Sequence, residues 1–135
     1  MGENEYDLYM RVDTNTCGHR QWFYFSMKNQ QKCKVKIHIH RFKKPYSLFQ
    51  RGMKPYVRSR KTDSDWRPGG TQVCYHLEHV RNEYGVKKPL GTSVLTFNYS
   101  FKAENDEVFV AAGVPYTYSY LQKQLSLIKA KVDSR

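Results

Sequence analysis

This chain of 135 residues lacks the features that define several common classes of protein. Its three cysteines, Cys17, Cys33 and Cys74, are too few and odd in number for a disulfide scaffold, and they favour a reducing compartment. No apolar run approaches the roughly 20 residues that a membrane helix needs. The start, MGENEYDLY, is acidic and polar, unlike a secretory signal. We therefore expect a cytoplasmic protein that has no membrane partner.

Acidic residues are also scarce, with 12 Asp and Glu against 23 Lys and Arg and a net charge of +11. The imbalance is confined to Lys28–Arg67, which holds 13 Lys or Arg and only two Asp. The summed field of such a segment attracts phosphate, anionic lipid or acidic peptide. The alternative interpretation is a solvated basic face that only aids solubility.

Apolar and polar residues alternate through most of the chain, which is the period of strands with one buried face. The clearest examples are residues 6–12, 35–40, 73–78 and 95–102, with turn residues between them. This spacing predicts an all-β fold, an antiparallel β-sandwich of about seven to nine strands. We expect residues 5–116 to form this domain. Residues 1–4 are expected to be disordered or left over from cloning.

The last residues, 117–135, change to a helical period. Four apolar residues recur there at the spacing of one helix face: Leu121, Leu125, Ile128 and Val132. Thr117 or Ser119 is a suitable N-terminal cap, and Pro115 lies just upstream. The sequence thus predicts a carboxyl-terminal helix with one apolar stripe.

One strand carries aromatic rings on both faces. In RQWFYFSMKN, which begins at Arg20, alternation places Phe23 and Phe25 on one face and Trp22 and Tyr24 on the other. The first pair fits an ordinary core. The second pair would expose roughly 300–500 Å² if left open, about the largest apolar patch that a soluble monomer tolerates. These rings need a cover: another loop, a nucleic-acid base or a missing neighbour.

Four blocks of sequence carry a resemblance to a known family. They are, in order, YDLYMRVDTNTCGHRQWFYFSMKN (Tyr6–Asn29), KVKIHIHRFKKPYSLFQRGMKPYVRS (Lys34–Ser59), DWRPGG (Asp65–Gly70) and PYTYSYLQKQL (Pro115–Leu125). With these blocks the chain resembles the amino-terminal domain of the cytosolic carboxypeptidases, zinc enzymes that trim glutamates from tubulin tails and other proteins. The most specific elements are the QWFYF strand, the F-x-K-x-x-SL-x-x-x-GM-x-P stretch and the PYTYS junction.

The resemblance implies an antiparallel β-sandwich placed just before a catalytic domain, with the helix leading toward that domain. It implies that five residues lie at the interface between the two domains: Trp22, Tyr24, Pro115, Tyr116 and Tyr118. It implies no catalytic or metal-binding residue in this chain, which contains no His-x-x-Glu pair. Zinc is expected in the parent catalytic domain, and this chain alone is expected to be inactive.

The resemblance also gives the basic segment a partner, an acidic polypeptide tail such as that of tubulin. Cations near the mouth of an active site would concentrate and steer such a tail. Seven cations lie in the irregular stretch best able to reach it: Lys43, Lys44, Arg51, Lys54, Arg58, Arg60 and Lys61.

Two pairs of possible metal ligands occur at a spacing of two residues, His38 with His40 and Cys74 with His76. Neither pair matches the spacing of a zinc finger or ribbon, and histidines on a solvated sheet face are the simpler interpretation. In the family, an Asn and an aliphatic residue stand where this chain has the two histidines. This departure weakens any inherited role for the strand.

Two other classes of function stay open. A single-stranded nucleic-acid binder would combine the basic segment with stacking rings such as Trp22, Tyr24 and Phe42. Nucleic acid is the less favoured partner because these rings fall on strands whose neighbours have the pattern of a core. A purely structural accessory domain would stabilise its catalytic neighbour without touching substrate.

Overall fold

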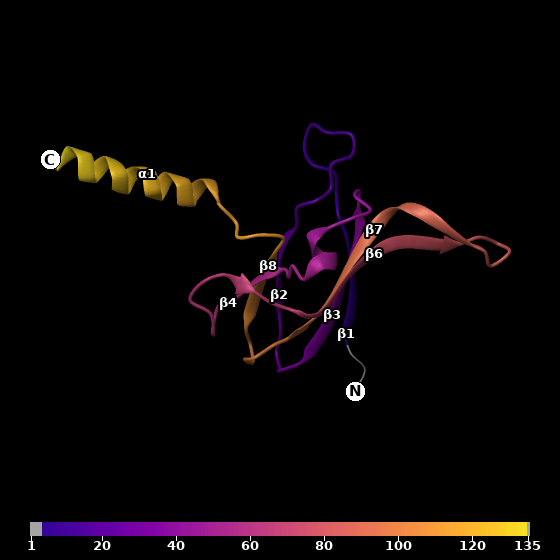
Figure 1. Cartoon of the computed structure of the whole chain (residues 1–135). Coiled ribbons are helices and arrows are strands. Elements are labelled where there is room, and N and C mark those ends of the chain that lie inside the picture. Colours follow the sequence, from indigo (N-terminus) through magenta and orange to yellow (C-terminus); the bar gives the residue numbers. More distant parts are fainter. Residues whose placement is uncertain (1–3, 135) are drawn as a thin grey trace.

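The computed structural model describes residues 4–134 and forms two β-sheets packed face to face, with a helix at the carboxyl end (Figure 1). One sheet has the order β1 (Asn4–Tyr9), β3 (Lys34–Phe42), β7 (Lys87–Ser100) and β6 (Thr71–Arg81). The other has the order β2 (Tyr24–Lys28), β8 (Glu107–Ala111), β4 (Tyr56–Ser59) and β5 (Arg67–Pro68). The predicted all-β sandwich is confirmed. The expectation for residues 1–4 falls outside the described residues, except that Asn4 begins β1.

One strand pair departs from the predicted antiparallel arrangement. β1 pairs with β3 in parallel, with Tyr6 opposite Ile37, whereas the other five strand pairings among the described residues are antiparallel. The cause is the connection between them, because the chain adds β2 to the second sheet before it returns to β3. Such a crossover leaves the two strands pointing the same way.

The core lies between β3 and β7 on one side and β8 and β4 on the other. Its most enclosed apolar side chains are at most 2% exposed: Ile37, Ile39, Val57, Leu95, Phe97, Val108 and Val110. Aromatic rings close one end, where Phe42 meets Phe23 and Tyr75 edge to face, with centroids 6.2 and 5.4 Å apart. Burying each large side chain stabilises the fold by roughly 1.5–3 kcal/mol.

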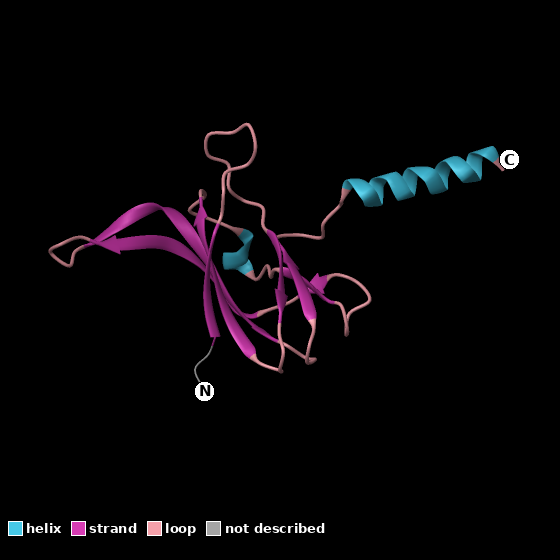
Figure 2. Cartoon of the chain, turned by 180° about the vertical axis from the view of Figure 1, so that it is seen from behind, coloured by secondary structure: helices cyan, strands magenta, loops and turns pink. Residues whose placement is uncertain are grey.

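Alternation mispredicted three positions. Tyr6, Val12 and Leu77 were expected on buried faces, but all three are exposed. Tyr6 lies on β1, at the edge of the first sheet. Val12 lies beyond the end of β1, in the long loop before β2. Leu77 lies where β6 and β7 leave the sandwich together as a two-stranded arm, residues 77–90 (Figures 1 and 2).

The predicted carboxyl-terminal helix is present as α1 (Tyr118–Asp133), and the backbone N–H of Tyr120 donates to the Thr117 hydroxyl at its N-cap. α1 projects away from both sheets (Figure 2), and none of its residues is buried. Its predicted apolar stripe therefore faces solvent. No helix among the described residues has the length and apolar character to cross a bilayer.

Candidate interdomain surface

Trp22 and Tyr24 lie on the outer side of the second sheet and are half exposed. Trp22 is 52% exposed, and its ring rests beside Gly113, where an added Cβ would lie 3.4 Å from the ring. Tyr24 is 50% exposed and meets the ring of Trp66 edge to face, with centroids 5.8 Å apart. The neighbouring Phe23 is buried, as alternation predicted. The described residues therefore cover these two rings only in part.

The segment after β8 continues this aromatic surface toward α1. Pro115 is half-buried, whereas Tyr116 and Tyr118 are exposed. The ring of Tyr116 meets that of Tyr120 edge to face, with centroids 5.2 Å apart. We call Trp22, Tyr24, Trp66, Phe109 and residues 113–120 the junction surface. It brings together all five residues that the resemblance placed at a domain interface.

Sequence reasoning missed Trp66, Phe109 and Gly113 as parts of this surface. Phe109 had a usable signal, because it alternates with the buried Val108 and Val110 and so points outward from β8. Trp66 had no such signal. It lies in a loop, and the apolar–polar pattern of a sequence does not predict where a loop residue lies.

The seven cations predicted to steer an acidic tail are all exposed, and they are spread over three segments. Lys43 and Lys44 follow β3, Arg51 and Lys54 flank the end of the 3-10 helix η1 (Leu48–Arg51), and Arg58, Arg60 and Lys61 belong to β4 or follow it. Arg60 is neutralised by Glu107, with Nη1 and Oε2 2.8 Å apart. Lys61 donates to the carbonyl of Glu104. The other five form no ion pair within the described residues.

The outer face of the first sheet carries a histidine–carboxylate network, formed by His38, His40, Glu5, Asp7, Glu78, Thr92 and Thr96. His38 places Nε2 2.5 Å from Glu5 Oε1 and Nδ1 2.8 Å from Thr96 Oγ1. His40 places Nε2 2.7 Å from Asp7 Oδ1 and Nδ1 2.5 Å from Glu78 Oε1. The network links β3 to β1 on one side and to β6 on the other.

Both partners of His40 are carboxylates, and these acceptors favour the imidazolium form of the ring, which donates from both nitrogens. Partial burial acts to lower the pKa of His40, but the hydrogen bonds to Asp7 and Glu78 outweigh burial and raise this pKa above its ordinary value. Burial likewise acts to raise the pKa of Glu78, and hydrogen bonds from Thr92 and His40 outweigh it and lower that pKa.

The same geometry bears on the possible metal site. His38 and His40 use both ring nitrogens in the network, and Cys74 Sγ lies 3.5 Å from His76 Nδ1. Among residues 4–134, no group of three or more His, Cys, Asp or Glu side chains is arranged to hold a metal ion. Residues 4–134 therefore do not fit the zinc site that the resemblance implies for the parent enzyme.

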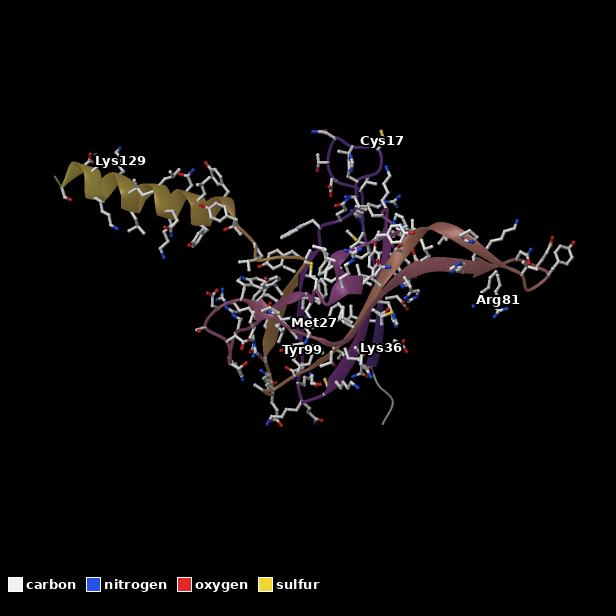
Figure 3. The ribbon with its side chains drawn as sticks, in the orientation of Figure 1. Cys17, Met27, Lys36, Arg81, Tyr99 and Lys129 are labelled. Carbon is white, nitrogen blue, oxygen red and sulfur yellow. The ribbon has the colours of Figure 1, made fainter. Side chains whose placement is uncertain are left out.

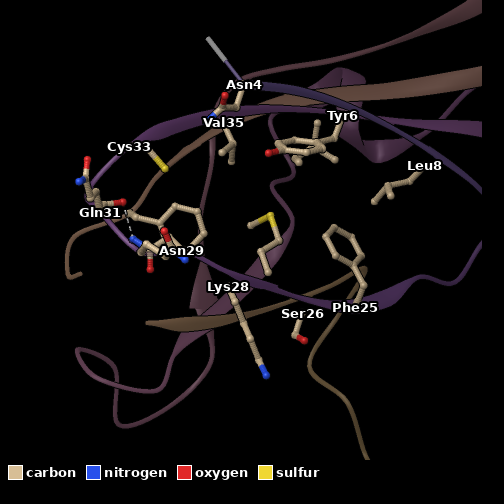
Figure 4. A pocket seen from close by; sticks show the side chains of 14 residues that line it. Asn4, Tyr6, Leu8, Phe25, Ser26, Lys28, Asn29, Gln31, Cys33 and Val35 are labelled. Carbon is tan, nitrogen blue, oxygen red and sulfur yellow. Dashed lines mark hydrogen bonds between the residues drawn. The ribbon is translucent and has the colours of Figure 1, made fainter. Parts of the chain in front are cut away.

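A hollow of about 540 Å³ opens between β1 and β2, the edge strands of the two sheets (Figure 4). Its lining is mostly apolar, with Tyr6 and Leu8 on one side and Phe25 and Met27 on the other. Lys28 points away from it in Figure 4. Six polar residues also line it: Asn4, Ser26, Lys28, Asn29, Gln30 and Gln31.

Comparison with known proteins places this arrangement in a family. Residues 1–112 match the model described as the cytosolic carboxypeptidase N-terminal domain, and the chain belongs to this family. It is 34% identical to cytosolic carboxypeptidase 4 of Mus musculus over 98% of its length. It is 37% identical to cytosolic carboxypeptidase 3 of Bos taurus over 93% of its length. The resemblance noted in the sequence is confirmed.

The chain corresponds to only a small part of these relatives. Each of the two matches covers 13% of the relative's length. The crystal structure of a proposed carboxypeptidase A from Shewanella denitrificans has a similar fold, with a TM-score of 0.57 and 14% identity. That similarity covers 95% of this chain and 28% of the other. At this identity the likeness shows the fold alone.

Proposed function

We propose that this chain is the non-catalytic N-terminal domain of a cytoplasmic zinc metallocarboxypeptidase that removes C-terminal glutamates from tubulin or other acidic tails. The observation that carries the proposal is the family match over residues 1–112, in relatives named cytosolic carboxypeptidases that are far longer than the match. The zinc ion and the catalytic groups would belong to the part of the parent protein that lies outside these 135 residues.

The junction surface and α1 are proposed to contact the catalytic domain. Trp22 and Tyr24 each leave half of their surface uncovered, and α1 exposes three members of its apolar stripe, Leu125, Ile128 and Val132. Rings of this size bury about 150–250 Å² when fully covered, so a neighbouring domain would gain stability by packing on them. This contact would make the N-terminal domain a support for the catalytic domain.

Steering of acidic substrate is the second part of the proposal. Five of the seven predicted cations have side chains that form neither an ion pair nor a hydrogen bond within the described residues, so their field is available to a negatively charged tail: Lys43, Lys44, Arg51, Lys54 and Arg58. The purely structural alternative differs in one respect, because it requires no effect of these cations on substrate kinetics.

The test of the activity compares the 135-residue chain with the longer parent protein, using release of glutamate from a polyglutamate peptide. We expect no turnover by the chain alone, and turnover by the longer protein that a zinc chelator abolishes. Turnover by the purified chain, or a longer protein that cleaves no acidic peptide, would contradict the proposal.

The test of steering replaces Lys43, Lys44, Lys54 and Arg58 with Gln in the longer protein. We expect a higher Michaelis constant for the polyglutamate peptide and a weaker dependence of that constant on salt. Unchanged kinetics at low ionic strength would contradict steering, and only the structural role would remain.

A further inference from the structure

The arm, residues 77–90, is the part of the sandwich that reaches furthest from α1. Figures 1 and 2 show the arm and α1 leaving the two sheets in opposite directions, and Figure 3 shows Arg81 out on the arm. Within the arm β6 and β7 pair only with each other, from His79 opposite Pro89 to Arg81 opposite Lys87. A two-stranded ribbon is marginally stable in water unless other contacts hold it.

Hydrogen bonds make the tip of the arm rigid. The side-chain oxygen of Asn82 accepts from the backbone N–H of Tyr84 at 3.0 Å and of Val86 at 2.9 Å. Backbone bonds join Asn82 to Val86 and to Gly85, which adopts a positive φ of 75°. Arg81 Nη1 donates to the Gly85 carbonyl at 3.0 Å. The turn is therefore fixed before any partner binds.

This rigid turn presents one large ring to solvent. Tyr84 is 81% exposed, and its ring contacts no other aromatic ring or cation among the described residues. Tyrosine is among the residues that contribute most to protein interfaces, because it buries a large area at a low cost in side-chain entropy. Fixing the turn in advance lowers the entropic cost of binding further.

The ribbon behind the tip carries exposed apolar side chains and three cations. Val80 lies opposite Lys88, and Leu90 shares their face because it is two residues from Lys88 in β7; Val86 is exposed just before β7. Arg81 pairs with Lys87 on the other face. Arg81, Lys87 and Lys88 are exposed and form no ion pair within the described residues, whereas the tip has one carboxylate, Glu83. The arm is thus complementary to an acidic surface.

We propose that the arm docks onto an acidic surface of a folded substrate protein, where the ring of Tyr84 enters an apolar hollow and Arg81, Lys87 and Lys88 meet carboxylates around it. The inference rests on the proposed function and adds a contact with the body of the substrate. A domain that packs on α1 and the junction surface leaves the arm free, since the two point in opposite directions.

The test measures binding of the 135-residue chain to tubulin dimers, with and without their acidic tails, by fluorescence anisotropy at a fixed salt concentration. Tyr84→Ala is expected to weaken binding roughly 30-fold, as for a central interface residue. Replacing Arg81, Lys87 and Lys88 together with Gln is expected to weaken binding roughly tenfold. Both effects persist with tail-less tubulin, because the arm binds the folded body.

Two matched variants serve as controls. Tyr46→Ala removes a ring that is 79% exposed, close to the value for Tyr84, but lies outside the arm. Replacing Lys32, Lys102 and Lys129 with Gln removes the same three charges from exposed positions elsewhere. Both controls are expected to stay within about twofold of the unmodified chain. Equal losses from the two triple variants would mean that net charge alone attracts tubulin, and the proposal would be wrong.

Photo-crosslinking from position 84 identifies the partner directly. Tyr84→p-benzoylphenylalanine is expected to crosslink to tubulin. Crosslinks only to a second copy of the chain, or in the longer protein only to its own catalytic domain, would overturn the proposal, as would full-affinity binding by Tyr84→Ala. Glutamate release by the longer protein is measured separately, so failure of the docking site and failure of the proposed function are distinguishable.

Discussion

The arm and α1 both leave the sandwich and both expose apolar side chains, but they are held in different ways. The arm continues β6 and β7 beyond a register shift between Leu77 and His79, and five hydrogen bonds at residues 81–86 fix its turn. α1 has its own backbone hydrogen bonds and one side-chain cap at Thr117, and it buries no residue. Isolated helices shorter than about 12–15 residues are marginal in water, and α1 is only slightly longer, with 16 residues. We therefore expect the arm to keep its conformation without a partner, and α1 to gain stability from one.

The largest expected effect is on the free energy of unfolding, and it differs between the two halves of β7. Phe97 is fully buried in the sandwich, whereas Leu90 lies on the same strand in the arm and is 56% exposed. We expect Phe97→Ala to lower the free energy of unfolding by about 3–5 kcal/mol, since it leaves a cavity in the core. Leu90→Ala should change this free energy by less than about 0.5 kcal/mol. Urea denaturation followed by circular dichroism measures both, and a costly Leu90→Ala would mean that the arm is part of the core.

The second effect is the loss of stability from a change in α1, and we expect it to differ between the 135-residue chain and the longer protein. In the 135-residue chain, Leu125→Ala should change the free energy of unfolding by less than about 0.5 kcal/mol, because α1 packs on nothing. In the longer protein the same change should cost about 1–2 kcal/mol, since covering Leu125 buries the half of its surface that is now exposed.

The control is Lys123→Ala, on the opposite side of the helix. It should leave the free energy of unfolding unchanged in both proteins. Thermal unfolding of the two variants in both proteins is the measurement. Equal effects of Leu125→Ala in the short and the long protein would argue against an interdomain role for α1.

Local sequence predicted most strands and the helix, because alternation and helical spacing each indicate which side chains share a buried face. It missed β4, which lies within the stretch that was expected to be irregular. It could not distinguish the parallel β1–β3 pair, because an edge strand with one buried face has the same alternation in either direction. It did not predict the arm either, where alternation breaks: Val80 follows Leu77 by three residues, at the register shift between Leu77 and His79. Local sequence could not predict the histidine–carboxylate network, because Asp7 and Glu78 are 33 and 38 residues from His40 along the chain.

The third effect is a pH dependence of the network, which reaches the arm only at Glu78. The raised pKa of His40 gives stability that is present below the ordinary histidine pKa and is lost as pH rises through the raised value. The lowered pKa of Glu78 gives stability that is present above the ordinary glutamate pKa and is lost as pH falls through the lowered value. The network should therefore stabilise the sandwich most between about pH 4.5 and 6.5.

Both groups are partly exposed, so solvent screening keeps the contribution below about 1 kcal/mol. His40→Gln should flatten the rise in stability as pH falls from 8 to 6, measured by urea denaturation. His79→Gln changes an arm histidine without a carboxylate partner among the described residues, and it should leave the pH profile unchanged. Identical profiles for His40→Gln and the unmodified chain would show that the network is too solvated to matter.

The smallest expected effect tests whether the arm really is held at its tip. Asn82→Ala removes the acceptor for the backbone N–H groups of Tyr84 and Val86. Each hydrogen bond contributes about 0.5–1.5 kcal/mol, so amide exchange at these two groups should become roughly three- to tenfold faster. Global stability should change by less than about 0.5 kcal/mol, because the turn is exposed.

The matching change in α1, Thr117→Ala, removes a single cap at the Tyr120 N–H and should free only the first turn of the helix. Unchanged exchange in Asn82→Ala would mean that the strand register alone orders the turn. Tyr84 would then owe its fixed position to β6 and β7, and its affinity for a partner should survive the loss of Asn82.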